Sequence, residues 1–175
     1  MPYTFNDHRH RYAIWTAARA VQRNFSVKIE DIKVAVENAN LRGYVEGCSS
    51  SSRNDFDFFQ KASAASIIDT LENKNIQNAS YGRASKIIAV YLKTALVLCN
   101  NAACQKSEVI HPPLDRILLQ KLSKEVHGLQ MLAKYNWTML DSDNYWKIVE
   151  LVRSKVGWFN WRVEEFWELG VDADK

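Results

Sequence analysis

The chain has 175 residues, 47% of them hydrophobic and 25% charged, and this balance is typical of a single globular domain. The sequence contains no apolar run of about 18 residues and no apolar leader near its start, so we expect neither a membrane span nor a secreted protein. The net charge is +3, but basic residues are concentrated before Lys28 and between Lys74 and Lys124. One basic face of this kind favours a polyanionic partner, although a solvated helical surface would give the same pattern.

Apolar residues recur at helical spacing along most of the chain, and no segment alternates as a surface strand would. The pattern predicts helices over residues 8–23, 26–41, 54–72, 80–99, 115–126, 141–156 and 160–169, with a turn or short helix at 128–132. Residues 43–52, 73–79 and 100–111 are predicted loops, the first of them with four consecutive serines. We therefore predict an all-α fold of six to eight helices that forms one domain over residues 1–175.

The three cysteines, Cys48, Cys99 and Cys104, do not have the spacing of metal ligands, and their number is odd. This usage indicates reduced thiols and a cytoplasmic protein that needs no metal or other cofactor.

The predicted helix at 80–99 is unusual because residues 87–98 are apolar on almost every side, as in a fully buried helix. It nevertheless carries Lys86 and Lys93, which are seven positions apart and so share one stripe. Lysine is seldom buried without a partner, so the stripe faces either solvent or a cleft. Downstream, Pro112 and Pro113 lead to Asp115, which stands where the next helix should begin.

The start of the same helix has the features of an anion site. Ser80 and Gly82 stand at the helix entry, where free backbone amides can bind phosphate, and Arg83 lies in the first turn. We predict DNA-phosphate contacts at Ser80, Gly82, Arg83 and Arg116. The alternative is an ordinary capped helical hairpin, in which Lys86 extends its ammonium to solvent and Asp115 is only a helix cap.

Two short segments carry a family resemblance. Lys-Ile-Ile-Ala-Val-Tyr-Leu-Lys at 86–93, followed by Pro-Leu-Asp-Arg at 113–116, resembles the helix-hairpin-helix DNA glycosylases, and the 8-oxoguanine glycosylases with their archaeal branch in particular. The resemblance covers about residues 75–119. The His-Pro-Pro-Leu-Asp-Arg segment also looks like bacterial members of this superfamily that are implied in defence against phages with modified DNA. The chain departs from the family in having Ser-Tyr-Gly where two glycines usually occur, in lacking cluster cysteines, and in its short length.

The resemblance implies a compact glycosylase-like bundle that acts as a monomer on double-stranded DNA containing a modified base. In that family a lysine after the hairpin attacks the sugar carbon, and this position matches Lys86. An aspartate some twenty to thirty positions later supports the reaction, and this position matches Asp115. The implied activity is release of the base, with or without strand cleavage. The base would be 8-oxoguanine or a hypermodified phage base such as glucosylated hydroxymethylcytosine.

A flipped base needs a pocket with stacking surfaces and polar groups. We predict that His10, Arg11, Trp15 and Arg19 line this pocket, and Trp137, Trp158 and Trp161 are further stacking candidates. Two other functions remain open. One is a helical DNA-binding module without catalysis, in which Lys86 and Asp115 are structural. The other is a protein-interaction scaffold that docks through the acidic, tryptophan-rich segment 158–168.

Overall fold

The fold is described from a computed structural model, and the description applies to residues 2–47, 51–98 and 105–167. The described residues are helical and include no strand, so the predicted all-α class is confirmed. Seven α-helices are present in these residues: α1 (Phe5–Val21), α2 (Ile29–Asn38), α3 (Leu41–Glu46), α4 (Arg53–Asn73), α5 (Tyr81–Leu92), α6 (Arg116–Glu125) and α7 (Ser142–Val156). Shorter helical segments are η1 (Lys93–Val97), η2 (Gln105–Val109), η3 (Gln130–Lys134), η4 (Trp137–Met139) and η5 (Trp161–Phe166).

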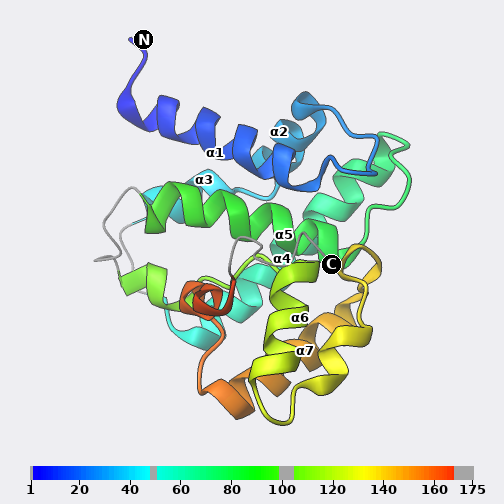
Figure 1. The fold of residues 1–175 in the computed structure, drawn as a ribbon. Helices are drawn as coiled ribbons and strands as arrows, with labels where there is room; N and C mark the ends of the chain where they lie inside the picture. The colour runs from blue at the N-terminus through cyan, green and yellow to red at the C-terminus, as the bar shows by residue number, and fades with distance from the viewer. Residues whose placement is uncertain (1, 48–50, 99–104, 168–175) are drawn as a thin grey trace, which may run out of the picture.

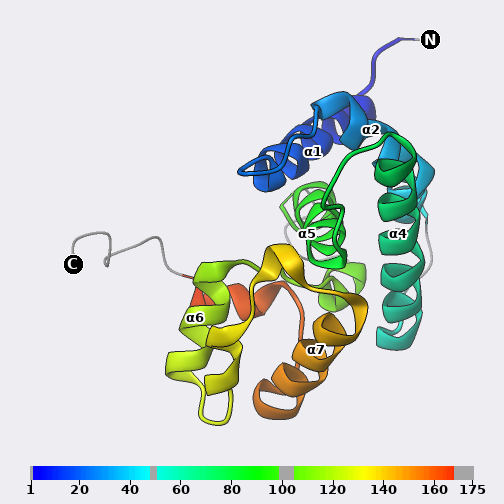
Figure 2. The same ribbon diagram turned by 90° about the vertical axis from the view of Figure 1, so that its right-hand side faces the viewer.

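Helix α5 lies at the centre of the molecule, and the other elements surround it (Figures 1 and 2). Helices α1 and α4 pack along it, and α2 packs against both α1 and α4. Helices α6 and α7 lie on the opposite side of α5. There η4 packs against the start of α5, and η5 packs beside α6. The bundle therefore has an N-terminal half and a C-terminal half that meet at α5.

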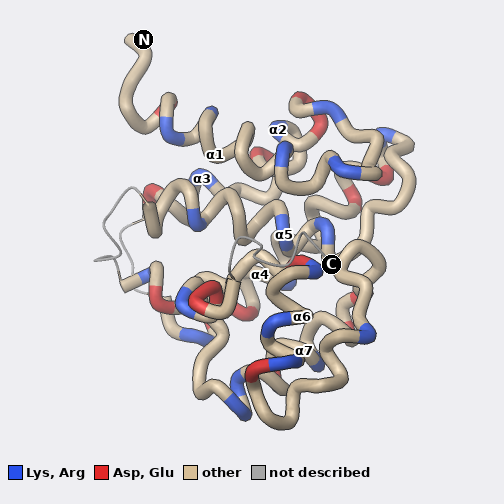
Figure 3. The backbone as a smooth tube through the Cα atoms, in the orientation of Figure 1, with Lys and Arg blue, Asp and Glu red and all other residues tan. Residues whose placement is uncertain are grey.

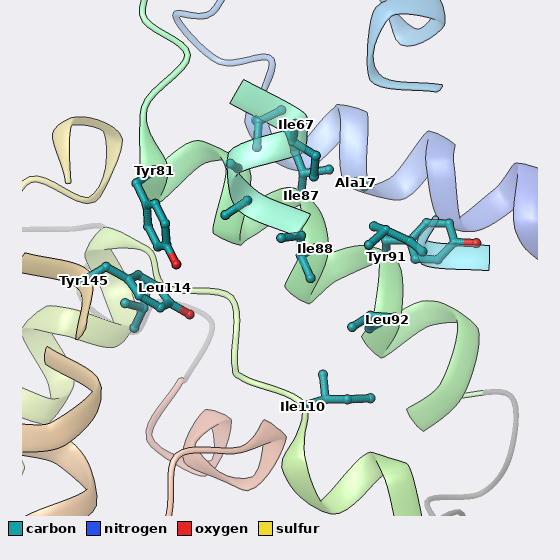
Figure 4. Packing of buried hydrophobic residues seen from close by; sticks show 14 of the residues in the cluster. Ala17, Ile67, Tyr81, Ile87, Ile88, Tyr91, Leu92, Ile110, Leu114 and Tyr145 are labelled. Carbon is teal, nitrogen blue, oxygen red and sulfur yellow. The ribbon is translucent and has the colours of Figure 1, made fainter. Parts of the chain in front are cut away.

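The core follows from the composition of α5, as the sequence predicted. Its apolar side chains point in several directions and contact both halves, as Figure 4 shows for Ile87, Ile88 and Leu92. Ala17 of α1 and Ile67 of α4 pack on one side of the helix, while Ile110 and Leu114 approach from the other. Burial on all sides explains why this helix has almost no polar face.

The N-terminal helices begin and end at residues that the sequence pattern placed slightly differently. Helix α1 is capped by Thr4, whose hydroxyl accepts a hydrogen bond from the Asp7 amide, while the Asp7 carboxylate accepts one from the Thr4 amide. Asp7 is therefore the N3 residue of a capping box, and α1 begins three residues before the predicted start at residue 8. Asn40 has φ of +51°, a left-handed conformation that ends α2 and separates it from α3. The predicted helix at 26–41 is therefore too long, because α2 ends at Asn38. The predicted loop from 43 is also wrong at its start, because α3 continues to Glu46.

Two predictions near the C-terminal half also differ from the structure. The predicted helix at 80–99 is α-helical only to Leu92 and continues as one π-helical turn, η1. The predicted helix at 160–169 is a 3₁₀ segment, and its last two positions lie outside the described residues, as do all three cysteines. None of the described helices combines the length and the apolar character needed to cross a bilayer.

Candidate functional site

Lys86 and Asp115 are 29 positions apart in sequence and meet in the structure. The Lys86 Nζ lies 3.5 Å from Asp115 Oδ2, and the two side chains are 11% and 20% exposed. Helix α5 supplies the lysine, and the start of α6 supplies the aspartate. The two residues that match the family's lysine and aspartate therefore lie together, and their low exposure places the pair just below the surface.

Asp115 is held by donors on both carboxylate oxygens. Its Oδ1 accepts a 2.9 Å hydrogen bond from the Leu118 amide, which caps α6 as the sequence predicted. Its Oδ2 accepts a 3.2 Å hydrogen bond from the indole N–H of Trp167. The carboxylate is therefore fixed in orientation before any ligand binds.

Lys86 lies between this carboxylate and an aromatic ring. Its ammonium is 4.2 Å from the centroid of the Trp137 ring, within the range of a cation–π interaction. Burial lowers the pKa of Lys86, and the charge of Asp115 offsets only part of that effect. We name Lys86, Asp115, Trp137 and Trp167 the Lys86 site. Trp137 was one of four stacking candidates in the sequence, whereas Trp167 carried no signal of its own.

Lys93, the second lysine of the predicted stripe, has a different environment. Its Nζ donates to both oxygens of Glu164 at 2.8 and 2.9 Å, which joins the end of α5 to η5. The stripe therefore faces α6 and η5, with one lysine engaged in a close ion pair and the other near its carboxylate at 3.5 Å.

The start of α5 does not form the predicted phosphate site. The Gly82 amide donates to Leu140 O at 3.0 Å, and the Ser80 hydroxyl donates to Thr138 O at 2.7 Å. A Cβ on Gly82 would collide with the Trp137 carbonyl oxygen, so glycine permits this close approach of η4. The protein's own backbone occupies the helix start, which contradicts the phosphate contacts expected of Ser80 and Gly82.

Arg83 and Arg116 have opposite environments, although both were predicted to contact phosphate. Arg83 is buried, and its guanidinium donates to the carbonyl oxygens of Asn78 and Asn24 at 2.8 and 3.2 Å. This placement contradicts its predicted DNA contact, because the buried side chain links the turns that contain Asn78 and Asn24 from inside the fold. Arg116 is exposed at the first residue of α6, next to Asp115.

The four residues predicted for the base pocket are not brought to the Lys86 site. His10 and Arg11 line a pocket of about 400 Å³ between α1 and α2, and His10 Nδ1 is 2.7 Å from the Tyr91 hydroxyl. Trp15 and Arg19 are exposed, and Trp15 stacks on Tyr12 of the same helix. The grouping of these four residues beside Lys86 and Asp115 is therefore wrong. The buried face of α1 packs on α5, and helical periodicity places Trp15 and Arg19 on the opposite face.

The basic face expected from residues 74–124 is smaller than the sequence suggested. Lys106 is buried and donates to the carbonyl oxygens of Tyr44 and Gly47, and Lys74 pairs with Asp31 at 3.0 Å. With Arg83, Lys86 and Lys93 also engaged, the exposed cations of this stretch lie along α6, where Figure 3 shows several basic positions. Charge counted along the sequence could not separate buried from exposed cations.

A second polar cluster, the Asp57 network, lies between α4 and α7. It consists of Asp57, His111, Tyr145 and Arg153. Arg153 donates to both Asp57 oxygens at 2.7 and 2.8 Å. The fully buried His111 contacts Asp57 through Nε2 at 3.1 Å and the Tyr145 hydroxyl through Nδ1 at 2.9 Å. Burial raises the pKa of Asp57, but hydrogen bonds from His111 and Arg153 outweigh it and hold that pKa well below its usual value.

Comparison of the chain with protein-family models, with curated proteins and with solved structures found no significant match. Among the described residues, no group of three or more histidine, cysteine or acidic side chains has an arrangement that could hold a metal ion. The functional argument therefore depends on the geometry of the Lys86 site.

Proposed function

We propose that the protein is a DNA glycosylase that removes a modified base through the Lys86–Asp115 pair. The observation that carries the proposal is the 3.5 Å approach of the Lys86 ammonium to the Asp115 carboxylate beside the Trp137 ring. A lysine whose pKa is lowered by burial supplies more free amine, which is the nucleophilic form. A fixed carboxylate beside it can stabilise positive charge on a sugar.

The covalent route assigns one step to each residue. The Lys86 amine attacks the sugar C1′, and the bond from C1′ to the base nitrogen breaks with its electron pair leaving on the base. The departing base takes up a proton, and the nitrogen of the lysine adduct loses one. Asp115 stabilises the positive charge that develops on the sugar as the bond breaks. Opening of the sugar ring then gives a Schiff base, which water hydrolyses or which loses the 3′ phosphate to nick the strand.

The alternative route uses water as the nucleophile, with Lys86 acting only through its charge. Asp115 is needed in both routes because both develop positive charge on the sugar. Lys86→Gln separates the two routes. It should eliminate an adduct trapped by borohydride, and it should stop base release only in the covalent route, which we favour.

The substrate is proposed to be a modified base in double-stranded DNA. The panel for testing it contains duplexes with 8-oxoguanine, with glucosylated hydroxymethylcytosine and with an unmodified site. The measurements are base release and borohydride trapping by the wild type, Lys86→Gln and Asp115→Asn. Lys93→Gln is the matched control, because it removes an equal charge from the same helix seven positions away.

Wild-type activity on one modified duplex, lost in Asp115→Asn and retained in Lys93→Gln, is the expected result. Asparagine is an effective helix cap, so Asp115→Asn should remain folded and still bind DNA. Release of every substrate base by Asp115→Asn at the wild-type rate would overturn the proposal. So would the absence of release from a panel widened to other modified bases. DNA binding without release would instead favour the helical DNA-binding module.

A further inference from the structure

A pocket of about 370 Å³ lies beside the Lys86 site, between α6 and the segment that joins η3 to η4. Its volume is within the range of about 300–1,000 Å³ that small-molecule sites occupy. Arg116 and Gln120 line it from α6, and Lys134, Tyr135 and Trp137 line it from the other side. Of the residues predicted for base recognition, Trp137 lines this pocket, whereas His10, Arg11, Trp15 and Arg19 do not.

Two cations of the pocket are available to an anionic ligand. Arg116 and Lys134 are exposed, they come from separate elements, and neither side chain forms an ion pair or hydrogen bond with another described residue. This distinguishes them from Lys86, Lys93 and Arg83, whose charged groups already have partners. A guanidinium and an ammonium that line one pocket from separate elements are the kinds of group that bind phosphate oxygens.

The aromatic side chains of the pocket add a second kind of contact. Tyr135 and Trp137 are half-buried, so ring surface is accessible from the pocket. Bases of single-stranded nucleic acid stack on such rings without strong sequence preference. A pocket that combines aromatic walls with cations that have no ion pair among the described residues therefore suits a nucleotide better than it suits inorganic phosphate or a nucleoside.

The position of the pocket sets which nucleotide it can hold. Trp137 lines the pocket and also contacts Lys86, and Arg116 directly follows Asp115 in the chain. Lys86 and Asp115 do not line the pocket themselves. A sugar held at Lys86 would therefore belong to the nucleotide next to the one in the pocket.

We infer that this pocket binds one nucleotide of a DNA strand, the neighbour of the nucleotide that is excised, which leaves the duplex stack together with it, with its phosphate on Arg116 and Lys134 and its base on Tyr135 and Trp137. The inference deepens the proposed function and rests on it for the identity of the neighbour. Binding of the nucleotide itself needs no catalysis, so the two claims can be tested separately.

The test is titration of the full chain with thymidine 5′-monophosphate, thymidine or inorganic phosphate, followed by the NMR signal of the Trp137 indole. We expect the monophosphate to bind more tightly than either part alone. Arg116→Ala, Lys134→Ala and Tyr135→Leu should each weaken its binding by about fivefold or more. Lys124→Ala is the matched control, because Lys124 is an exposed cation of α6 that does not line the pocket.

A five-nucleotide thymidine strand supplies a second measurement. Its affinity should fall with salt, and removal of Arg116 or Lys134 should make the slope of log affinity against log salt shallower by about 0.7. Equal weakening by Lys124→Ala would overturn the inference in favour of diffuse attraction. Binding of phosphate as tight as that of the monophosphate would also overturn it, because the aromatic walls would then contribute nothing.

Failure of the pocket assignment and failure of the glycosylase proposal would give different experimental results. If the pocket variants bind nucleotide like the wild type while base release still depends on Asp115, the pocket assignment fails and the glycosylase proposal stands. If the monophosphate binds as expected but no duplex of the widened panel loses a base, the glycosylase proposal fails. In that case the pocket is a nucleotide site of a protein that binds DNA without excising a base.

Discussion

The two polar clusters of the protein differ in how completely their charges are bonded. In the Asp57 network, both carboxylate oxygens accept a close hydrogen bond from Arg153, and His111 adds a third contact. In the Lys86 site, the ammonium has one carboxylate oxygen at 3.5 Å and an aromatic face. Lysine has three N–H donors, so Lys86 retains donor capacity that the guanidinium of Arg153 uses on Asp57. The first arrangement suits a structural role, and the second suits a group that must react.

The largest effect is expected in the Asp57 network. Arg153→Met should lower the free energy of unfolding by about 3 kcal/mol or more, because it leaves the Asp57 carboxylate without its two close donors. His111 cannot replace them fully, since burial lowers its pKa and disfavours the charged form. Urea unfolding of the variant and the wild type measures the difference.

Arg162→Met is the control for this change. Arg162 also pairs with a carboxylate, Glu108, but both side chains are 44% exposed. Removal of an exposed ion pair should change stability by less than about 1 kcal/mol. Similar losses in Arg153→Met and Arg162→Met would mean that the Asp57 network has no special structural role.

A smaller loss of stability is expected at Gly82, where η4 packs against the start of α5. Gly82→Ala places a Cβ against the Trp137 carbonyl, a backbone atom that cannot rotate away. Overpacking of this kind costs roughly 1–3 kcal/mol, and displacement of η4 should also move the Trp137 ring from Lys86. Thermal unfolding measures the first effect and the Trp137 indole signal the second.

Gly43→Ala is the control, and it tests whether replacement of any helical glycine by alanine would lower stability. A Cβ there would meet only the side chain of Asn40, which is exposed and can rotate. Alanine also favours a helix by up to about 1 kcal/mol over glycine, so we expect stability to be unchanged or raised. A Gly82→Ala variant as stable as the wild type would show that η4 does not depend on this close approach.

The helical class and the central helix could be predicted from local signals: apolar residues on all sides of 87–98, and an aspartate placed to cap the next helix. The pairing of Lys86 with Asp115 was suggested only by the family resemblance, because the two residues are 29 positions apart. The surroundings of the pair could not be predicted in this way. Trp167 reaches Asp115 across 52 positions, and Trp137 reaches Lys86 only because η4 packs on Gly82. These contacts depend on tertiary packing, which has no periodic signature.

The predicted phosphate contacts failed for a related reason. A serine and a glycine at a helix start favour anion binding only when the amides face solvent. Here Leu140 and Thr138 supply the acceptors, and they are some sixty positions away in sequence. Arg83 likewise donates to Asn24 across 59 positions. Local motifs indicated which groups could bind an anion. The acceptors that these groups contact instead are distant in sequence, so a local motif could not predict them.

A change within about 1 kcal/mol is expected when the lysine of the Lys86 site is replaced by an apolar side chain. Lys86→Met removes a charge whose burial is unfavourable. The Asp115 carboxylate keeps the Leu118 amide and the Trp167 indole as donors, whereas Arg153→Met takes both close donors from Asp57. Urea unfolding should therefore show little loss, in contrast to Arg153→Met. A loss of about 3 kcal/mol or more would make the pair structural and would weaken its assignment to catalysis.

The smallest expected change concerns reactivity and not stability. Burial lowers the pKa of Lys86, and the charge of Asp115 raises it again in part. Asp115→Asn removes that charge but retains a helix cap, so the pKa of Lys86 should fall further and the fraction of free amine near pH 8 should increase. Labelling of Lys86 by an amine-specific reagent, followed by peptide mass spectrometry, should be faster in Asp115→Asn than in the wild type. Lys93, labelled in the same protein, is the internal control. Faster labelling together with lost base release would separate the two roles of Asp115, because the variant would hold a more reactive amine and still fail to stabilise the charged sugar. Slower labelling of Lys86 would contradict the electrostatic coupling on which the proposed mechanism depends.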